Sequence, residues 1–175
     1  MSAVTAPKGL DALHALDDVA ARAALLRCCG STQWATQMAR QRPFSSVESL
    51  LAAADATWAA LAAEDWLEAF AAHPRLGSRR DVEAKSASTR AWSEQEQSGV
   101  AAAAAEVQRA LADANAAYEA KFGRVYLACA TGKSAEELLA LCRARLANDA
   151  QTELAVAAEE QRKITRLRLH KLLEA

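Results

Sequence analysis

The stretch from residue 46 to residue 61 constrains the fold most strongly, because its apolar residues recur with the period of an α-helix. Ser46 stands just before them, where a serine side chain can accept hydrogen bonds from the first free amides of a helix. The apolar positions are Val47, Leu50, Leu51, Ala54, Trp58 and Leu61. A stripe of this kind must pack against a partner, so it predicts an amphipathic helix within an assembly of helices.

The rest of the chain repeats this pattern in segments rich in alanine, the best helix former. Further helices are expected at about 10–16, 17–28, 32–40, 65–72, 93–123, 134–146 and from 148 almost to the end. Asp17 should cap the second of these, and Ser134-x-x-Glu137 is a capping box at the start of the sixth. Only residues 125–130 have a β-like composition, and one strand makes no sheet, so this run predicts a buried extended connector. The sequence therefore predicts an all-α fold: a single-domain bundle of about seven to nine helices over residues 1–175, with a loose N-terminus at 1–9.

Charge and composition exclude several classes of protein. The formal net charge is −1 and the basic residues are dispersed, which argues against a nucleic-acid partner. No apolar run approaches the roughly 18–20 residues that cross a membrane, and the first residues lack the pattern of a signal peptide. The cysteines form no C-x-x-C pair, so we expect reduced, mostly buried thiols in a cytoplasmic protein and no metal site. These cysteines are Cys28, Cys29, Cys129 and Cys142.

Two segments carry residue types suited to acid–base chemistry. His73 precedes Pro74, and proline disfavours the helical conformation in the residue before it, so His73 should end a helix. Glu96 stands three residues after Ser93, where another helix should begin after a long loop at 75–91. A histidine and a glutamate so placed could act as an acid–base pair. They could equally be a helix terminator and the glutamate of a Ser-x-x-Glu capping box.

The last helix contains an arginine where an apolar residue is expected. Ile164, Arg168 and Leu172 are spaced four residues apart, which places Arg168 in an apolar stripe, whereas Arg166 aligns with Arg162 on a polar face. A guanidinium that faces the core needs an anionic partner. Arg168 is therefore a structural ion-pair partner, a side chain whose charge reaches solvent, or an anion-binding group in a pocket.

Seven groups of residues, in order along the chain, carry a family resemblance. They are Trp34-Ala35 through Arg42-Pro43-Phe44, His73-Pro74-Arg75-Leu76-Gly77, Trp92-Ser93 with Glu96-Gln97-x-Gly99, Asn115-x-x-Tyr118, Phe122-Gly123-Arg124-Val125, Arg145-Leu146-x-Asn148-Asp149 and Leu167-Arg168-Leu169. With these motifs the chain, from about Asp17 to Leu172, resembles the decarboxylases of 2-oxo-4-hydroxy-4-carboxy-5-ureidoimidazoline (OHCU), a family of urate breakdown.

The resemblance implies an all-helical homodimer that needs no cofactor and converts a small ureide, OHCU, to CO2 and (S)-allantoin. His73 matches the family's catalytic histidine and Glu96 its catalytic glutamate. The family's substrate-contacting positions are matched by Pro74, Ser93, Gln97, Ala128, Cys129, Ala130, Thr131, Gly132 and Arg168. Arg166 competes with Arg168 for the last of these positions, and the apolar stripe favours Arg168.

The implied chemistry assigns His73 to proton transfer at the reacting centre, Glu96 to holding the imidazole and sharing the proton, and Arg168 to a substrate oxygen. The chain departs from some members at Arg124-Val125, where they have an aromatic-proline pair. It also ends without a Ser-Lys-Leu type address, which favours a cytoplasmic location over peroxisomes. Two other functions remain open: a non-catalytic helical binding module, and a lyase or hydrolase acting on a related ureide.

Overall fold

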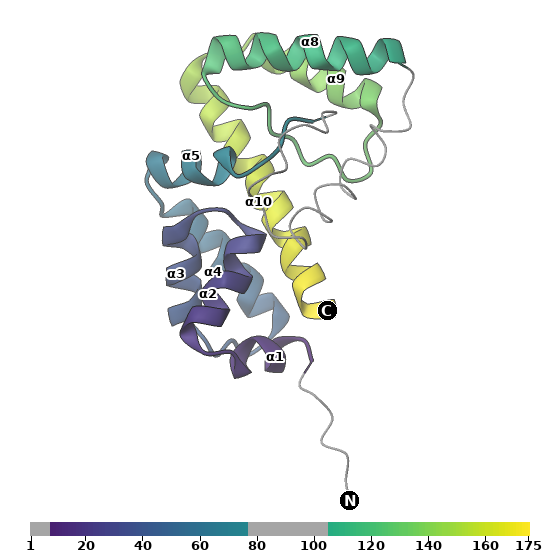
Figure 1. Ribbon diagram of the computed structural model, residues 1–175. Helices are drawn as coiled ribbons and strands as arrows, with labels where there is room; N and C mark the ends of the chain where they lie inside the picture. Colours follow the sequence, from purple (N-terminus) through teal and green to yellow (C-terminus); the bar gives the residue numbers. More distant parts are fainter. Residues whose placement is uncertain (1–7, 77–104) are drawn as a thin grey trace, which may run out of the picture. The chain divides into compact units, whose positions relative to one another are not determined.

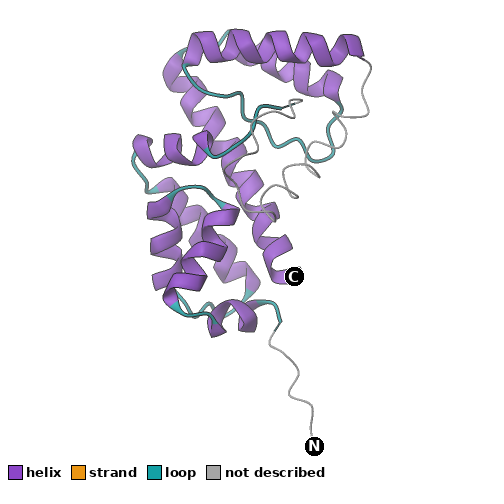
Figure 2. Ribbon diagram, viewed as in Figure 1, coloured by secondary structure: helices purple, strands orange, loops and turns teal. Residues whose placement is uncertain are grey.

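The computed structural model describes residues 8–76 and 105–175, which form eight helices and no strand (Figures 1 and 2). The helices are α1 (Leu10–Ala15), α2 (Asp18–Cys28), α3 (Thr32–Arg40), α4 (Val47–Ala59), α5 (Ala63–Ala71), α8 (Ala105–Phe122), α9 (Ala135–Arg145) and α10 (Ala150–Glu174). This confirms the predicted all-α fold class.

The chain divides into two compact units, which are described separately. Unit 1 comprises Met1–Glu68 and Arg162–Ala175, and unit 2 comprises Ala69–Gln161. The helices α5 and α10 contribute residues to both units. The single domain expected over residues 1–175 stays a prediction.

In unit 1, short-range caps start the helices and aromatic side chains hold them together. Asp17 accepts a hydrogen bond from the Ala20 amide at 2.8 Å, and Ser46 accepts one from the Ser49 amide at 3.1 Å, which confirms both predicted N-caps. Trp34 is fully buried, and its indole N–H donates to the Ala54 carbonyl at 3.1 Å, which ties α3 to α4. The stripe predicted on α4 forms part of this core.

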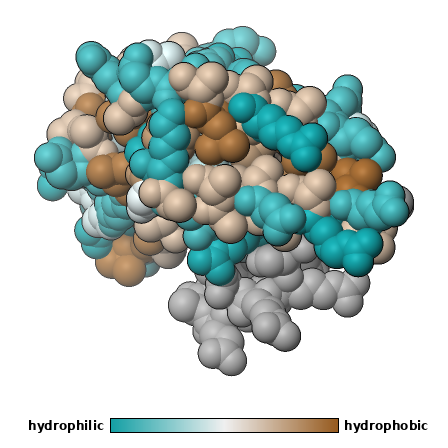
Figure 3. Space-filling model, turned by 90° about the horizontal axis from the view of Figure 1, so that it is seen from above, coloured by the Kyte–Doolittle hydropathy of each residue, from teal (hydrophilic) through white to brown (hydrophobic). Residues whose placement is uncertain are grey.

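In unit 2, α8 lies beside α9 (Figure 1), with an apolar cluster that includes the fully buried Leu111, Tyr118 and Leu138. Gly123 follows α8 with φ of 68°, a left-handed conformation that glycine adopts without strain. Seen from above the view of Figure 1, hydrophobic and weakly hydrophobic residues are interspersed with hydrophilic ones on the surface (Figure 3).

The segment from Tyr126 to Ala130 is buried and belongs to no helix or strand, which confirms the predicted extended connector. After it, α9 begins with the predicted capping box. The Ser134 hydroxyl accepts from the Glu137 amide at 3.1 Å, and the Glu137 carboxylate accepts from the Ser134 amide at 2.7 Å.

Candidate functional site

His73 lies at the end of α5, as its position before Pro74 predicts. The helix ends at Ala71, and the His73 amide donates to the Phe70 carbonyl at 3.1 Å in a final tight turn. The imidazole is half-buried. Its Nε2 lies 2.6 Å from the side-chain oxygen Oε1 of Gln161, a fully buried residue of α10.

The residues that follow His73 are fixed to α8. Asn115 donates its side-chain N–H to the Leu76 carbonyl at 2.8 Å, and Leu76 packs into the apolar cluster of unit 2. One turn further along α8, Glu119 accepts two hydrogen bonds from the Arg75 guanidinium, at 2.6 and 2.9 Å. These contacts give a structural reason for the His-Pro-Arg-Leu and Asn115-x-x-Tyr118 motifs, because α8 sets the path of the chain that leaves His73.

Side chains from elsewhere in unit 2 hold the backbone of the connector. The Cys129 amide donates to the Glu160 carboxylate at 2.7 Å, and the Cys129 carbonyl accepts from the Lys133 ammonium at 2.9 Å. The turn that follows is made by Gly132 with φ of 77°. Glu160 immediately precedes Gln161 on α10. Two consecutive residues of one helix therefore hold His73 and the segment 128–132, both predicted as parts of one site.

A buried ion pair between Arg145 and Glu153 helps to position the connector. Glu153 is fully buried and accepts from the Arg145 guanidinium, from the Tyr118 hydroxyl at 2.6 Å and from the Asn148 side chain at 3.0 Å. Arg145 also donates to the Leu127 carbonyl at 2.7 Å, so the pair positions the connector. The Asn115-x-x-Tyr118 and Arg145-Leu146-x-Asn148 motifs thus meet at a glutamate that neither contains.

The electrostatics of this cluster follow from burial and hydrogen bonding. Burial alone raises the pKa of the Glu153 carboxyl, but the hydrogen bonds from Arg145, Tyr118 and Asn148 outweigh it, and the pKa falls below its ordinary value. Burial and the bond to Glu153 raise the pKa of Tyr118 to about 12, so the phenol remains a donor. The cluster therefore holds one carboxylate, one guanidinium and a neutral phenol at neutral pH.

Arg168, in unit 1, is only 4% exposed, which confirms that it faces inward on α10. Burial raises the pKa of the neighbouring Cys28 and Cys29 thiols to about 12, although the positive charge of Arg168 acts in the opposite direction on both. Arg166 instead donates to Asp55 at 2.8 Å, and Arg162 donates to the same carboxylate at 3.1 Å. The two arginines of the polar face are thus engaged in a half-exposed ion pair.

Several predicted features lie outside the described residues, namely Ser93, Glu96, Gln97, the loop from residue 77 to residue 91 and the start of the helix that follows it. Within the described residues, no cluster of three or more His, Cys, Asp or Glu side chains is placed to hold a metal ion. None of the helices described combines the length and apolar composition that a membrane span requires. The four cysteines are buried, as predicted.

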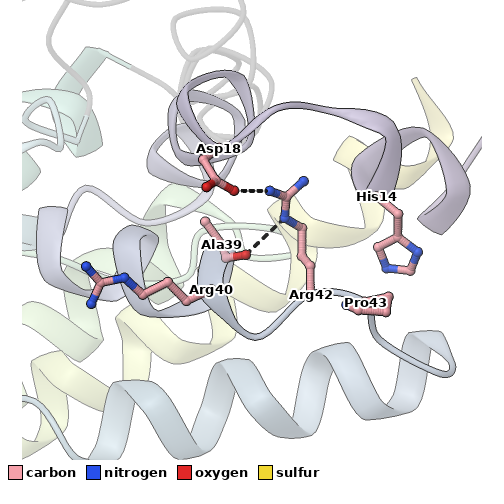
Figure 4. Close-up of a pocket in the computed structure, with 6 residues that line it drawn as sticks. All are labelled: His14, Asp18, Ala39, Arg40, Arg42 and Pro43. Atoms are coloured by element: carbon pink, nitrogen blue, oxygen red, sulfur yellow. Dashed lines mark hydrogen bonds and ion pairs between the residues drawn. The ribbon is translucent and has the colours of Figure 1, made fainter.

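A separate pocket of about 520 Å³ opens in unit 1, and sequence reasoning did not identify it (Figure 4). It is lined by His14, Asp18, Ala39, Arg40, Arg42 and Pro43. The Arg42 guanidinium donates to the Ala39, Leu13 and Leu16 carbonyls and to Asp18, so its hydrogen bonds hold the polypeptide in place. No residue predicted for the decarboxylase site lines this pocket.

Sequence reasoning also missed Glu153, Glu160 and Gln161. For Gln161 and Glu153, the helical period of α10 gives a signal. Residues three or four positions apart share one helix face, and this face includes five residues that are all buried: Arg168, Ile164, Gln161, Ala157 and Glu153. The face of α10 on which Arg168 points inward therefore carries three buried polar side chains, those of Arg168, Gln161 and Glu153. No comparable signal marks Glu160, which is half-buried.

Comparison with known proteins agrees with these motifs. A family model described as OHCU decarboxylase matches residues 14–170. The uric acid degradation bifunctional protein TTL of Arabidopsis thaliana is 37% identical over 145 residues, which are 83% of this chain and 45% of that protein. The chain thus spans about half the length of that curated relative.

Two solved structures share the fold. A crystal structure of OHCU decarboxylase in the presence of (S)-allantoin matches with a TM-score of 0.75 and 31% identity, over 91% of this chain and all of that one. A crystal structure of (S)-allantoin synthase matches with a TM-score of 0.70 and 19% identity, over 95% of this chain and 54% of that one. From the family match over residues 14–170 and the 31% identity to the solved OHCU decarboxylase, the chain belongs to the OHCU decarboxylase family.

Proposed function

We propose that this protein catalyses the cofactor-independent decarboxylation of OHCU to (S)-allantoin and CO2 in urate degradation. Family membership supports this reaction. The proposed site is supported by two consecutive residues of α10: Glu160 accepts a hydrogen bond from the connector backbone, and Gln161 contacts the His73 imidazole. A general acid–base group must be held within reach of the substrate, and a half-buried histidine with a fixed ring meets that need.

In the proposed reaction, the bond between the ring carbon and the carboxylate breaks and CO2 leaves. The electron pair forms a C=C bond to the neighbouring ring carbon while the π electrons of that carbon's C=N bond move to the nitrogen, which takes up a proton, so the substrate itself serves as the electron sink. The hydroxyl on the same ring carbon then gives up its proton as a carbonyl forms, and the neighbouring carbon receives a proton on one face. His73 and Glu96 transfer these protons. Delivery of the proton to a single face of the carbon gives a single enantiomer.

The remaining site residues are proposed to bind and orient the substrate. Arg168 would pair with a carboxylate or carbonyl oxygen, a role suited to a buried guanidinium. Backbone groups of residues 128–132 and the side chains of Ser93 and Gln97 would contact the ureido and ring atoms, with Pro74 shaping the wall beside His73. We also propose that the protein works as a cytoplasmic homodimer, which light scattering coupled to gel filtration would test.

The deciding experiment generates OHCU in situ from urate with the two preceding enzymes, adds this protein, and follows allantoin by circular dichroism. We expect rapid formation of the (S) enantiomer. His73→Asn should return the trace to the slow spontaneous decay, whereas His170→Asn should leave the rate unchanged, because His170 is an exposed histidine of α10. A wild-type trace that matches the spontaneous racemic decay would show that the proposed function is wrong.

A further inference from the structure

The contact between His73 and Gln161 bears on which ring nitrogen of His73 carries the hydrogen. The side-chain oxygen Oε1 of Gln161 lies 2.6 Å from His73 Nε2. An amide oxygen only accepts hydrogen bonds, so in this orientation of the Gln161 amide the hydrogen is on Nε2. A neutral imidazole has one ring hydrogen, and its second nitrogen, here Nδ1, then bears the lone pair.

We propose that Gln161 is a positioning residue that holds His73 as the Nε2–H tautomer, so that Nδ1 is the atom through which His73 takes up and releases the proton of the decarboxylation. This inference rests on the proposed function for its catalytic part. Gln161 does not itself touch the reacting atoms. It acts through the ring it orients.

The surroundings of Gln161 suit it to this task. The side chain is fully buried, so few rotamers are open to it. The residue also lies near the middle of α10, away from both helix ends. An uncharged amide accepts the Nε2 hydrogen without favouring the imidazolium form as strongly as a carboxylate would. The carboxylate next to Gln161 in sequence, Glu160, accepts from the Cys129 amide.

Rotation of the Gln161 amide would present its N–H group to the ring and would favour the opposite tautomer. The two arrangements therefore differ in a measurable way. Long-range 1H–15N correlation spectra of 15N-labelled protein distinguish the two ring nitrogens, and the chain has only three histidines. The His73 signals are assigned by their loss in His73→Asn. We expect the neutral ring of wild-type His73 to carry its hydrogen on Nε2.

Two substitutions then test whether Gln161 is responsible. Gln161→Glu keeps an acceptor oxygen and should keep the Nε2–H tautomer. Gln161→Leu removes the acceptor at similar volume and should give a mixture of tautomers; Gln161→Met, which has no strong acceptor, replaces it if the leucine variant does not fold. The matched control is Gln41→Leu in unit 1, which removes the 2.8 Å bond from Gln41 to Thr57 and should leave the His73 spectrum unchanged.

Turnover of OHCU supplies the catalytic readout. Partners that orient metal-binding histidines typically contribute about 10–100-fold, and we expect a similar fall in kcat for Gln161→Leu, with little change in KM. Gln161→Glu should recover most of that loss. Wild-type His73 with its hydrogen on Nδ1, or a leucine variant that keeps the wild-type tautomer and kcat, would overturn the inference. The spectra report the tautomer without turnover, so an inactive wild-type protein would refute the proposed function and the catalytic part of this inference together.

Discussion

Replacing Glu153 with leucine should destabilise unit 2 strongly, because it leaves a buried cation without its counter-ion. Glu153 is fully buried and Arg145 is 8% exposed. The substitution removes every hydrogen bond that the carboxylate accepts, from Arg145, Tyr118 and Asn148. Removing one member of a buried ion pair typically costs about 3–5 kcal/mol.

The remaining contacts of Arg145 place the expected loss at the lower end of that range. Its guanidinium keeps the bond to the Leu127 carbonyl at 2.7 Å and lies 4.9 Å from the centre of the Tyr126 ring. A desolvated cation–π contact of this kind offsets up to about 2 kcal/mol. We therefore expect Glu153→Leu to lower the free energy of unfolding by about 3 kcal/mol. Glu153→Gln, which keeps an acceptor oxygen, should lower it by about 1–3 kcal/mol.

Urea unfolding followed by circular dichroism at one protein concentration measures these differences. The control is the double variant Glu153→Leu with Arg145→Met, which removes both charges and should recover much of the loss, because apolar replacement of a whole buried pair is often neutral. If Glu153→Leu stays within about 1 kcal/mol of wild type, or if the double variant loses the sum of the two single losses, the ion pair does not stabilise the unit as argued.

The pH dependence of this effect has a definite sign. The pKa of Glu153 in the folded protein lies below its ordinary value of 4.5, so its stabilisation is complete above that value and is lost as the pH falls through the folded pKa. The difference in unfolding free energy between wild type and Glu153→Gln should therefore be largest near neutral pH and shrink on acidification below 4.5.

Three further predictions concern the proposed site. His73→Asn should lower turnover by about 10²–10⁴-fold with an unchanged far-ultraviolet circular dichroism spectrum, and a variant that keeps most of the rate would exclude His73 as the acid–base group. Glu96→Gln should abolish most turnover while costing well under about 1 kcal/mol in stability, and near-normal turnover would leave Glu96 only a capping role. Arg168→Lys should weaken (S)-allantoin binding in calorimetry, because lysine lacks the planar two-pronged donor. Arg166→Lys should leave that affinity unchanged and cost less than about 1 kcal/mol, since Arg166 forms a half-exposed pair with Asp55; the opposite result would place the ligand on the other face of the helix.

The features that sequence predicts well here depend on residues close together in the chain. The caps at Asp17, Ser46 and Ser134 each need only a side chain and an amide three residues later, and all three form. The inward position of Arg168 follows from the helical period in the same way. His73 ends its helix because the next residue is a proline, which is again a local effect.

The supporting contacts of the site are not local, and this is why the sequence does not reveal them. Gln161 meets His73 across 88 residues of chain, and Glu160 meets the Cys129 amide across 31. The helical period places Gln161 on the buried face of α10 but does not say which side chain it meets, and Glu160, which lies off that face, fits a solvated position equally well. Only the fold shows which partner each of them contacts. The sequence alone gives Arg145 no role beyond its place in a motif.

The connector also bears on how the protein avoids aggregation through β-strand pairing. Residues 125–130 have the composition of a strand, and an extended segment with unpaired amides and carbonyls is a template for strand pairing with another chain. In this protein, Arg145 donates to the Leu127 carbonyl and Lys133 donates to the Cys129 carbonyl. The Glu160 carboxylate accepts from the Cys129 amide. These side chains take the place of a neighbouring strand. Substitutions that remove them are therefore expected to promote intermolecular β-sheet formation and aggregation during refolding.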